Sequence, residues 1–429
     1  MDFARSVEYL FSLGNEVSAM KLGLENIRTL LAAFGNPHEK YIKVQVAGTN
    51  GKGSVCAFLD SICNEAGIAT GTYTSPHLVS ITERIRINGV DITEDEFARI
   101  ANVVRETSDS LLSLKRLEYR PTFFEQMTAI ALVAFAEANV QLAILETGLG
   151  GRLDATTAAK AEIAAITRID LDHQEYLGDT IEQIAAEKAA IIQPGSKVAI
   201  SDQDPRAMGV ILDRCGRSEI RPRFASQITC IKEPPATIRS PQTTYAGVLL
   251  GLRGNHQVEN AKVAILIAET LQEHFPISTQ NVIDGLRNAR HPGRLELSGK
   301  FLFDGAHNAG GAFALRAYVD RSVTRPITMI FGAMKGKDIA VMAETLFPVA
   351  ETLILTRPEN SRAMSADELK QLVPRDLTIR NLVLTDSVKE AISEAERRSP
   401  DQGLILVTGS LYLVGEAKKL LQEKATAEI

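Results

Sequence analysis

The sequence predicts an α/β fold in which a mostly parallel sheet carries a phosphate-binding loop and is followed by a second, smaller α/β domain. Two observations lead to this fold class. Short apolar runs rich in β-branched residues alternate with helical patterns along most of the chain, as expected for parallel strands joined by crossover helices. A glycine-rich segment with a lysine and a serine, residues 47–54, also stands between the first strong strand and a helix.

The elements before residue 291 follow this alternation in order. Strands are predicted at 41–46, 68–73, 140–145 and 163–169, and helices at 54–66, 91–114, 121–138, 180–192, 255–273 and 279–290. Two of these helices begin with capping-box pairs, Thr93 with Glu96 and Thr122 with Glu125. Segment 215–250 is less regular, and we expect antiparallel strands or loops there, at the edge of the sheet.

A domain boundary is predicted at HPGR, residues 291–294, because the alternation of strands and helices restarts after it. Further strands are predicted at 301–303, 327–331, 352–355, 382–384 and 404–407. A segment of about 135 residues is long enough for one compact domain. We therefore predict an N-terminal domain over 1–290 that contains the P-loop, and a smaller, Rossmann-like α/β C-terminal domain over 291–429.

The composition excludes several classes of protein. The chain has 429 residues, with 47 basic and 53 acidic side chains and a net charge of −6. Nucleic-acid binding needs clustered positive charge and stacking rings, and only 5% of the residues are aromatic, so no nucleic-acid partner is expected. Four cysteines without a C-x-x-C pair fit a reducing compartment. The first residues show no signal-peptide pattern and no run reaches the ~18 apolar residues of a membrane span. We expect a cytoplasmic protein with no membrane partner.

Residues 47–54, AGTNGKGS, have the features of a phosphate loop. Small residues let backbone N–H groups approach phosphate oxygens, the following helix start attracts anions, and Lys52 adds a full positive charge. The usual P-loop spacing is not met, since Val46 stands where a glycine is expected and Gly53 separates Lys52 from Ser54. A glycine-rich turn with an incidental lysine is the alternative, but strand, loop, lysine, hydroxyl and helix in this order favour a nucleotide site.

Polar residues follow three other predicted strands. Ser75 follows 68–73, Glu146 follows 140–145, and His173 follows 163–169. Ligands of open parallel sheets bind beyond the carboxyl ends of the strands, so these side chains are candidates for the Mg²⁺ of a nucleotide. Structural roles, a solvated glutamate and a packed histidine, are the alternatives. Lys188 lies among alanines in helix 180–192, and the residues alone favour a solvated helix lysine.

Taken together, these segments resemble the folylpolyglutamate synthase and dihydrofolate synthase family of Mur-ligase-like, ATP-dependent amide ligases. The matching pieces are AGTNGKGS at 47–54, TSPHL at 74–78, ERIRING at 83–89, ETGLGGRLDAT at 146–156, LDHQEYLGDTIEQIAAEKAAI at 171–191, GNHQVENA at 254–261, HPGRLE at 291–296 and DGAHN at 304–308. MKLGLENI at 20–27 is similar to the folate-contacting region of the family. The pieces run in family order over nearly the whole chain.

The resemblance implies a role for individual residues. ATP phosphates would be held by Thr49, Asn50, Gly51, Lys52, Gly53 and Ser54, and ATP would also contact Asn260, Arg294 and Asp304. Mg²⁺ would be coordinated by Ser75, Glu146 and His173. The pterin-bearing substrate would approach Phe124, Leu153, Asp154 and Ala155. Lys188 matches the lysine that the family carbamylates, which replaces the solvated-lysine interpretation. The expected catalytic residues are Lys52, Lys188, His173 and His307.

The resemblance further implies that ATP drives amide formation between L-glutamate and the carboxylate of a pterin substrate, through an acyl phosphate. The substrate would be dihydropteroate, a folate that already carries glutamate, or both. Residues 1–290 would be the ATP-binding, Mur-ligase-like central domain with the folate site, and 291–429 the C-terminal glutamate ligase domain. We expect a monomer.

Two alternatives remain at this point. One is a Mur-type peptide ligase acting on another carboxylate substrate, which is disfavoured because only about 40 residues precede the phosphate-loop strand. The other is a nucleotide-dependent regulatory module without ligase chemistry, which would need no His173 or Lys188.

The chain departs from the family pattern at four positions, Thr157, Arg168, Asp170 and Ala190. None of these is a proposed ligand. Arg168 and Asp170 replace smaller or neutral residues, and an ion pair between them is predicted.

Overall fold

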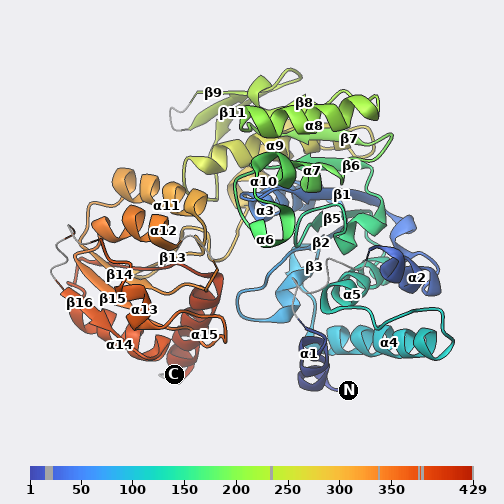
Figure 1. The fold of residues 1–429 in the computed structure, drawn as a ribbon. Coiled ribbons are helices and arrows are strands. Elements are labelled where there is room, and N and C mark those ends of the chain that lie inside the picture. The colour runs from blue at the N-terminus through green and yellow to red at the C-terminus, as the bar shows by residue number, and fades with distance from the viewer. Residues whose placement is uncertain (15–22, 232–234, 337–338, 375–376, 378–380, 428–429) are drawn as a thin grey trace. The chain divides into compact units, whose positions relative to one another are not determined.

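The computed structural model describes residues 1–14, 23–231, 235–336, 339–374, 377 and 381–427 (Figure 1). The chain folds into two compact units. The first comprises Met1–His77, Ile81–Gly251 and Gln257–Arg290, and the second comprises Leu78–Ser80, Leu252–His256 and His291–Ile429. The predicted folate-contacting piece at 20–27 lies outside the described residues as far as residue 22.

The first unit is built on an eight-stranded sheet of order β4-β3-β2-β5-β1-β6-β7-β8. Its strands are β1 (Ile42–Ala47), β2 (Thr70–Tyr73), β3 (Ile85–Ile87), β4 (Val90–Asp91), β5 (Leu142–Glu146), β6 (Ile163–Ile166), β7 (Lys197–Ile200) and β8 (Arg223–Phe224). The run from β2 to β8 is parallel, and only β3 and β4 are antiparallel. The predicted, mostly parallel sheet is thereby confirmed.

Helices cover both faces of this sheet. They are α1 (Phe3–Ser12), α2 (Glu25–Ala33), α3 (Lys52–Glu65), α4 (Glu94–Ser113), α5 (Phe123–Glu137), α6 (Gln174–Leu177), α7 (Ile181–Ala189), α8 (Pro205–Arg217), α9 (His256–Leu271) and α10 (Thr279–Asn288). Short 3-10 turns are η1 (Pro37–Lys40), η2 (Ile81–Arg84), η3 (Ala155–Ala159) and η4 (Ala225–Gln227).

Strand β2 shows how the two faces are divided between α3 and α5. The hydroxyls of Thr70 and Thr72 donate to Asp60 of α3, at 2.7 and 2.9 Å. Gly71 lies between them and faces the other side, where a Cβ atom would stand 2.4 Å from the ring of Phe135 in α5. Alternate residues of a strand point to opposite faces, so α3 and α5 sandwich the sheet. Helix α5 begins with the predicted capping box of Thr122 and Glu125.

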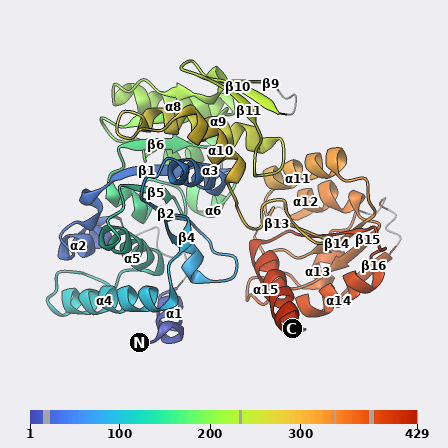
Figure 2. The ribbon, with the colours of Figure 1, turned by 180° about the vertical axis from the view of Figure 1, so that it is seen from behind.

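Segment 215–250 contains antiparallel strands, as predicted, but most of them leave the main sheet. β9 (Thr229–Ile231), β10 (Ala236–Arg239) and β11 (Thr244–Val248) form their own three-stranded sheet beside α9 (Figure 2). Of this segment, β8 alone joins the edge of the main sheet. The predicted place at the sheet edge is therefore wrong for β9–β11. Ser240 and Tyr245 of this segment bond instead to a buried carboxylate, Glu269 of α9, which holds the small sheet beside that helix.

The second unit contains a six-stranded sheet of order β12-β13-β17-β14-β15-β16, parallel except for β12. The strands are β12 (Glu296–Ser298), β13 (Phe301–Asp304), β14 (Ile327–Phe331), β15 (Thr352–Leu355), β16 (Asn381–Leu384) and β17 (Leu404–Thr408). The helices are α11 (Ala309–Ser322), α12 (Ile339–Leu346), η5 (Phe347–Val349), α13 (Ala366–Lys370), α14 (Val388–Arg398) and α15 (Leu411–Ala427). The five predicted strands are all present. Within the described part of the chain, no helix is both long and apolar enough to cross a membrane.

Two helical glycines allow a test of the packing that holds α3 in place. Gly285 of α10 lies against α3, and a Cβ atom there would stand 2.4 Å from the Cα of Ile62, whereas nothing lies within 4 Å of such an atom at Gly209 of α8. We expect Gly285→Ala to lower the free energy of unfolding by about 1–3 kcal/mol, because backbone cannot move aside cheaply. Gly209→Ala should raise it by about 0.5–1 kcal/mol through helix propensity. Urea unfolding of both variants would contradict this packing if the two shifts had the same sign.

Candidate active site

The phosphate-loop segment follows β1, which lies between β5 and β6 in the middle of the sheet (Figure 1). Helix α3 begins at Lys52, and Gly51 before it has φ of 94°, a left-handed conformation that favours glycine. A Cβ atom at Gly51 would also stand 2.3 Å from the side-chain oxygen of Asn260. The first N–H groups of a helix have no partner inside the helix and attract anions. The loop therefore presents a helix start to a ligand.

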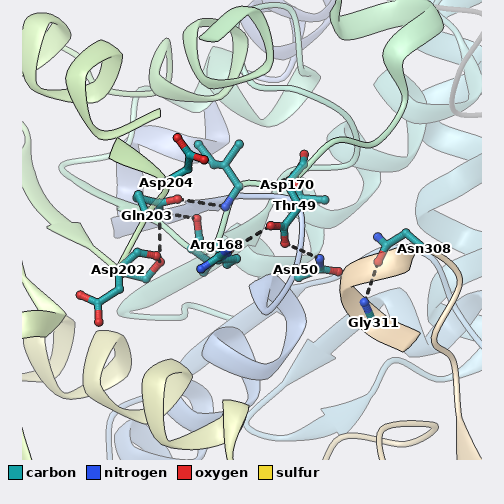
Figure 3. Close-up of polar contacts among 12 residues, drawn as sticks. Thr49, Asn50, Arg168, Asp170, Asp202, Gln203, Asp204, Asn308 and Gly311 are labelled. Atoms are coloured by element: carbon teal, nitrogen blue, oxygen red, sulfur yellow. Dashed lines mark hydrogen bonds and ion pairs between the residues drawn. The ribbon is translucent and has the colours of Figure 1, made fainter. Parts of the chain in front are cut away.

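A neighbouring loop, residues 167–170 after β6, holds the phosphate-loop segment in place. The backbone N–H groups of Thr49 and Asn50 both donate to the carbonyl of Arg168, at 2.8 and 3.1 Å. The side chain of Asn50 donates to Asp170 at 2.9 Å, and Arg168 pairs with Asp170 at 3.1 Å. The predicted ion pair between Arg168 and Asp170 is confirmed (Figure 3).

Two lysine ammonium groups meet at the carbonyl of Gly48. The Nζ atom of Lys188 donates to it at 2.8 Å and that of Lys52 at 3.1 Å. Lys188 is only 4% exposed, so the solvated-lysine interpretation is wrong. Burial, and next the nearby charge of Lys52, lowers the pKa of Lys188 to about 7. The structure thus brings two predicted catalytic residues together at the phosphate loop.

The buried side chain of Glu146 stands at the end of β5 and accepts a hydrogen bond from the backbone N–H of Ser75 at 3.2 Å. Burial, and secondly the charge of Glu146, raises the pKa of the Cys56 thiol in the first turns of α3. Glu146 and Ser75 are therefore neighbours at the strand edge that carries the phosphate loop.

His173 lies beyond β6, on the other side of β1 from Glu146. Its backbone N–H donates to Asp172 at 2.8 Å, and its ring Nε2 lies 3.9 Å from the same carboxylate. In the described part of the chain, no three His, Cys, Asp or Glu side chains are grouped in a way that could hold a metal ion. A site built from Ser75, Glu146 and His173 stays a prediction.

The predicted substrate residues lie around the loop after β5. Asp154 is buried and accepts hydrogen bonds from the N–H groups of Gly148, Leu149 and Thr156, so its carboxylate shapes this loop. Phe124 lies so close to Gly148 that a Cβ atom there would stand 2.6 Å from the ring. Ala155 is buried and Leu153 is half-buried. Phe124 and Asp154 thus both contact the loop after β5.

Sequence reasoning missed two groups of residues. Gln257 of α9 donates to the hydroxyl of Ser54 at 3.2 Å and accepts from Asn260 at 2.9 Å, so it supports the start of α3. Arg84 donates to His77 at 2.8 Å and lies over the ring of Phe123. Both groups lie in or next to the motifs at 254–261, 74–78 and 83–89, but nothing in the motifs shows which side chains meet.

In the second unit, three predicted residues gather around Gly305 at the end of β13. Arg294 donates to the Gly305 carbonyl at 3.2 Å, and the Nδ1 atom of His307 lies 2.8 Å from the same oxygen. Asp304 accepts from the N–H groups of Leu295 and Ala306, both at 3.0 Å. Burial raises the pKa of Asp304, and the Arg294 charge partly offsets this. These residues form one polar cluster within their unit.

Comparison with known proteins now decides the family. Residues 46–268 match the model of the Mur ligase middle domain, and 293–420 that of the dihydrofolate synthetase C-terminal domain. The dihydrofolate synthase/folylpolyglutamate synthase of Bacillus subtilis is 34% identical over 419 residues, covering 94% of this chain and 96% of that protein. The chain belongs to the dihydrofolate synthase/folylpolyglutamate synthase family.

Solved structures of family members have the same fold. Folylpolyglutamate synthase of Mycobacterium tuberculosis, complexed with ADP and AMPPCP, has a TM-score of 0.89 at 29% identity and covers 98% of this chain and 99% of its own. The Escherichia coli FolC complex with DHPP and ADP has a TM-score of 0.88 at 27% identity and covers 99% of both chains. The predicted family and fold class are therefore confirmed.

The burial of Lys188 gives a pH-dependent prediction about stability. Its pKa is about 7 in the folded protein and 10.5 ordinarily, so between these values the unfolded chain binds more protons and stability rises with pH. Lys188→Met lacks this rise, which amounts to at most about 1.4 kcal/mol per pH unit. In CO₂-free buffer, urea unfolding at pH 7 and pH 9 should show the wild type gaining on Lys188→Met. Lys197→Met, which removes an exposed lysine, is the control. If the wild type gained as much stability over Lys197→Met as over Lys188→Met between pH 7 and pH 9, the lowered pKa of Lys188 would be contradicted.

Proposed function

We propose that this chain is an ATP-dependent ligase that joins L-glutamate to the carboxylate of a pterin substrate. The observation that carries the proposal is the pair of lysines, Lys52 and Lys188, at one carbonyl of a loop that leads into a helix start. The positive charge of the lysines and the N–H groups at the helix start would both attract the phosphates of a nucleotide. Family relatives are named dihydrofolate synthase/folylpolyglutamate synthase, and one solved relative holds DHPP and ADP.

The chemistry follows from the poor reactivity of a carboxylate, whose oxygen does not leave as oxide at neutral pH. A carboxylate oxygen of the pterin substrate attacks the γ-phosphorus of ATP, which releases ADP and leaves an acyl phosphate. The amine of glutamate then attacks the acyl carbon, loses a proton and expels phosphate. Lys52, with Thr49 to Ser54, is proposed to hold the phosphates. Asn260 is proposed as a further ATP contact. Arg294 and Asp304 of the second unit are proposed as such contacts too, and His307 shares the Gly305 carbonyl with Arg294.

The strand edge also offers ligands for magnesium. The carboxylate of Glu146 and the hydroxyl of Ser75 are the oxygen donors that Mg²⁺ prefers, and the two residues touch through the Ser75 N–H. His173 would add a nitrogen ligand, which is less usual for this ion. When bound, Mg²⁺ would neutralise charge on the phosphates. Glu146 and Ser75 fit the ion best by their chemistry.

Lys188 is proposed to carry a carbamate. Its amine attacks CO₂, forms an N–C bond and releases a proton, and only the neutral amine can do this. With a pKa of about 7, about half of the Lys188 amines are neutral at pH 7, against roughly one in 3,000 for an ordinary lysine. The carbamate would turn a buried cation into an anion beside Lys52, which removes the repulsion between the two ammonium groups.

The carbamate can be observed without any activity assay. In enzyme equilibrated with ¹³C-bicarbonate, we expect a protein-bound carbamate carbon signal in ¹³C NMR that is absent from Lys188→Met and present in Lys197→Met. The signal should be smaller at pH 6 than at pH 8, because protonation of Lys188 competes with CO₂. A signal of full size in Lys188→Met would contradict the proposal.

Lys52→Ala tests the phosphate loop. We expect ADP formation in the presence of dihydropteroate and glutamate to fall by a factor of about 100 or more. The variant lacks the Lys52 ammonium, whose positive charge would stabilise the negative charge on the transferring phosphoryl group. The exposed Lys197→Met should keep wild-type turnover. Near-normal turnover of Lys52→Ala would remove this loop from the mechanism.

The choice of substrate needs its own assay. We propose a bifunctional enzyme, so purified protein should form ADP with glutamate and either dihydropteroate or tetrahydrofolate. ADP formation that ignores both glutamate and the pterin would favour a regulatory nucleotide-binding module. A monomeric state and a cytoplasmic location remain predictions.

A further inference from the structure

We propose that Arg168 and Asp170 are positioning residues for the nucleotide: Asp170 fastens the phosphate loop, and Arg168 cancels the negative charge that this places beside the phosphates. The inference rests on the proposed function, because it assigns the anion on this loop to ATP. Neither residue belongs to the predicted ligand set, and both depart from the pattern on which the family resemblance rests.

The carboxylate oxygens and the backbone of Asp170 contact different residues. One carboxylate oxygen accepts from the Asn50 side chain at 2.9 Å, and the other pairs with the Arg168 guanidinium at 3.1 Å. The backbone N–H and carbonyl of Asp170 both bond to the Thr49 hydroxyl, at 3.1 and 3.0 Å. Figure 3 shows Asp170 between Arg168 and Asn50. Asp170 therefore holds both residues that precede Gly51.

The supporting loop is itself held from behind. The side chain of Gln203 accepts from the N–H of Ile169 at 3.0 Å and donates to the carbonyl of Thr167 at 2.9 Å. Gln203 thus spans the stretch that carries Arg168. Because this loop is fixed by Gln203, its hydrogen bonds restrain the positions of Thr49 and Asn50.

The charges explain why the arginine accompanies the aspartate. A carboxylate next to an anion-binding loop repels the triphosphate, and the repulsion acts over several ångströms where solvent is partly excluded. The guanidinium of Arg168 forms an ion pair with the Asp170 carboxylate. The charge of Arg168 also interacts electrostatically with the carboxylate of Asp204. The pair supplies a strong hydrogen-bond acceptor to Asn50 without adding net charge to the site.

A set of variants separates these two roles. Arg168→Gln leaves the Asp170 charge uncompensated, and we expect the Kd for AMPPCP in the presence of Mg²⁺ to rise about fivefold. Asp170→Asn keeps an acceptor for Asn50 and loses the charge, so its Kd should stay within about twofold of wild type. The double variant, Arg168→Gln with Asp170→Asn, should return to the same range. Asp170→Ala lacks the acceptor and should bind more weakly than Asp170→Asn.

The control is Arg99→Gln. Arg99 forms an exposed ion pair with Glu137, and its side chain is 54% exposed against 56% for Arg168. Calorimetric titration with AMPPCP should find its Kd unchanged, and thermal unfolding should give similar midpoints for all the variants.

The outcomes distinguish the possible failures. A double variant as weak as Arg168→Gln would mean that Arg168 binds the nucleotide itself, and wild-type affinity in Arg168→Gln would mean that the charge has no effect. Equal affinities of Asp170→Asn and Asp170→Ala would remove the positioning role. Each of these results overturns the inference and leaves the ligase intact. If the wild type binds no AMPPCP, the proposed function falls and takes the inference with it.

Discussion

The candidate site depends on one electrostatic constraint, the meeting of two ammonium groups at the carbonyl of Gly48. Lys188 is buried there and Lys52 is partly so. A buried charge is costly, and the lowered pKa of Lys188 expresses that cost, which the nearby carboxylates of Asp172 and Asp154 offset only in part. The proposed carbamate on Lys188, or a phosphate bound beside Lys52, would supply the negative charge that these two ammonium groups lack. The two lysines thus concentrate positive charge at this loop.

The sheet order explains how residues from distant parts of the chain reach this point. Because β1 lies between β5 and β6, and β2 lies beyond β5, the loops that follow these parallel strands open at one edge. Glu146 and Ser75 arrive on one side of the phosphate loop, and Asp170 and His173 on the other. The helices α3 and α9 then bring Ser54 and Gln257 together. The order of the strands brings these loops to the same edge of the sheet, and hydrogen bonds between their residues fix the positions of the side chains.

Much of this was predictable from sequence because it is local or periodic. The strands, the capping box of α5, the phosphate loop and the polar residues after Tyr73 and Leu145 all follow from neighbouring residues. The burial of Lys188 did not, since alanines around a lysine fit a solvated helix equally well, and only the contact with Gly48, far away in the sequence, decides it. The small sheet β9–β11 was misplaced for a similar reason: Ser240 and Tyr245 of this segment bond to Glu269, which follows the segment in the sequence and lies on α9.

The glycines of the phosphate loop show that its shape is set by its neighbours as much as by its ligand. A Cβ atom at Gly48 would stand 1.9 Å from the hydroxyl of Thr167, and one at Gly51 would meet Asn260. The loop is therefore in close contact with the loop after β6 and with α9. The N–H groups of Thr49 and Asn50 are bonded to the carbonyl of Arg168, so the loop after β6 fixes the backbone of these two residues. The first turn of α3 leaves its N–H groups without partners inside the helix, and its place is fixed by these contacts of the loop that precedes it.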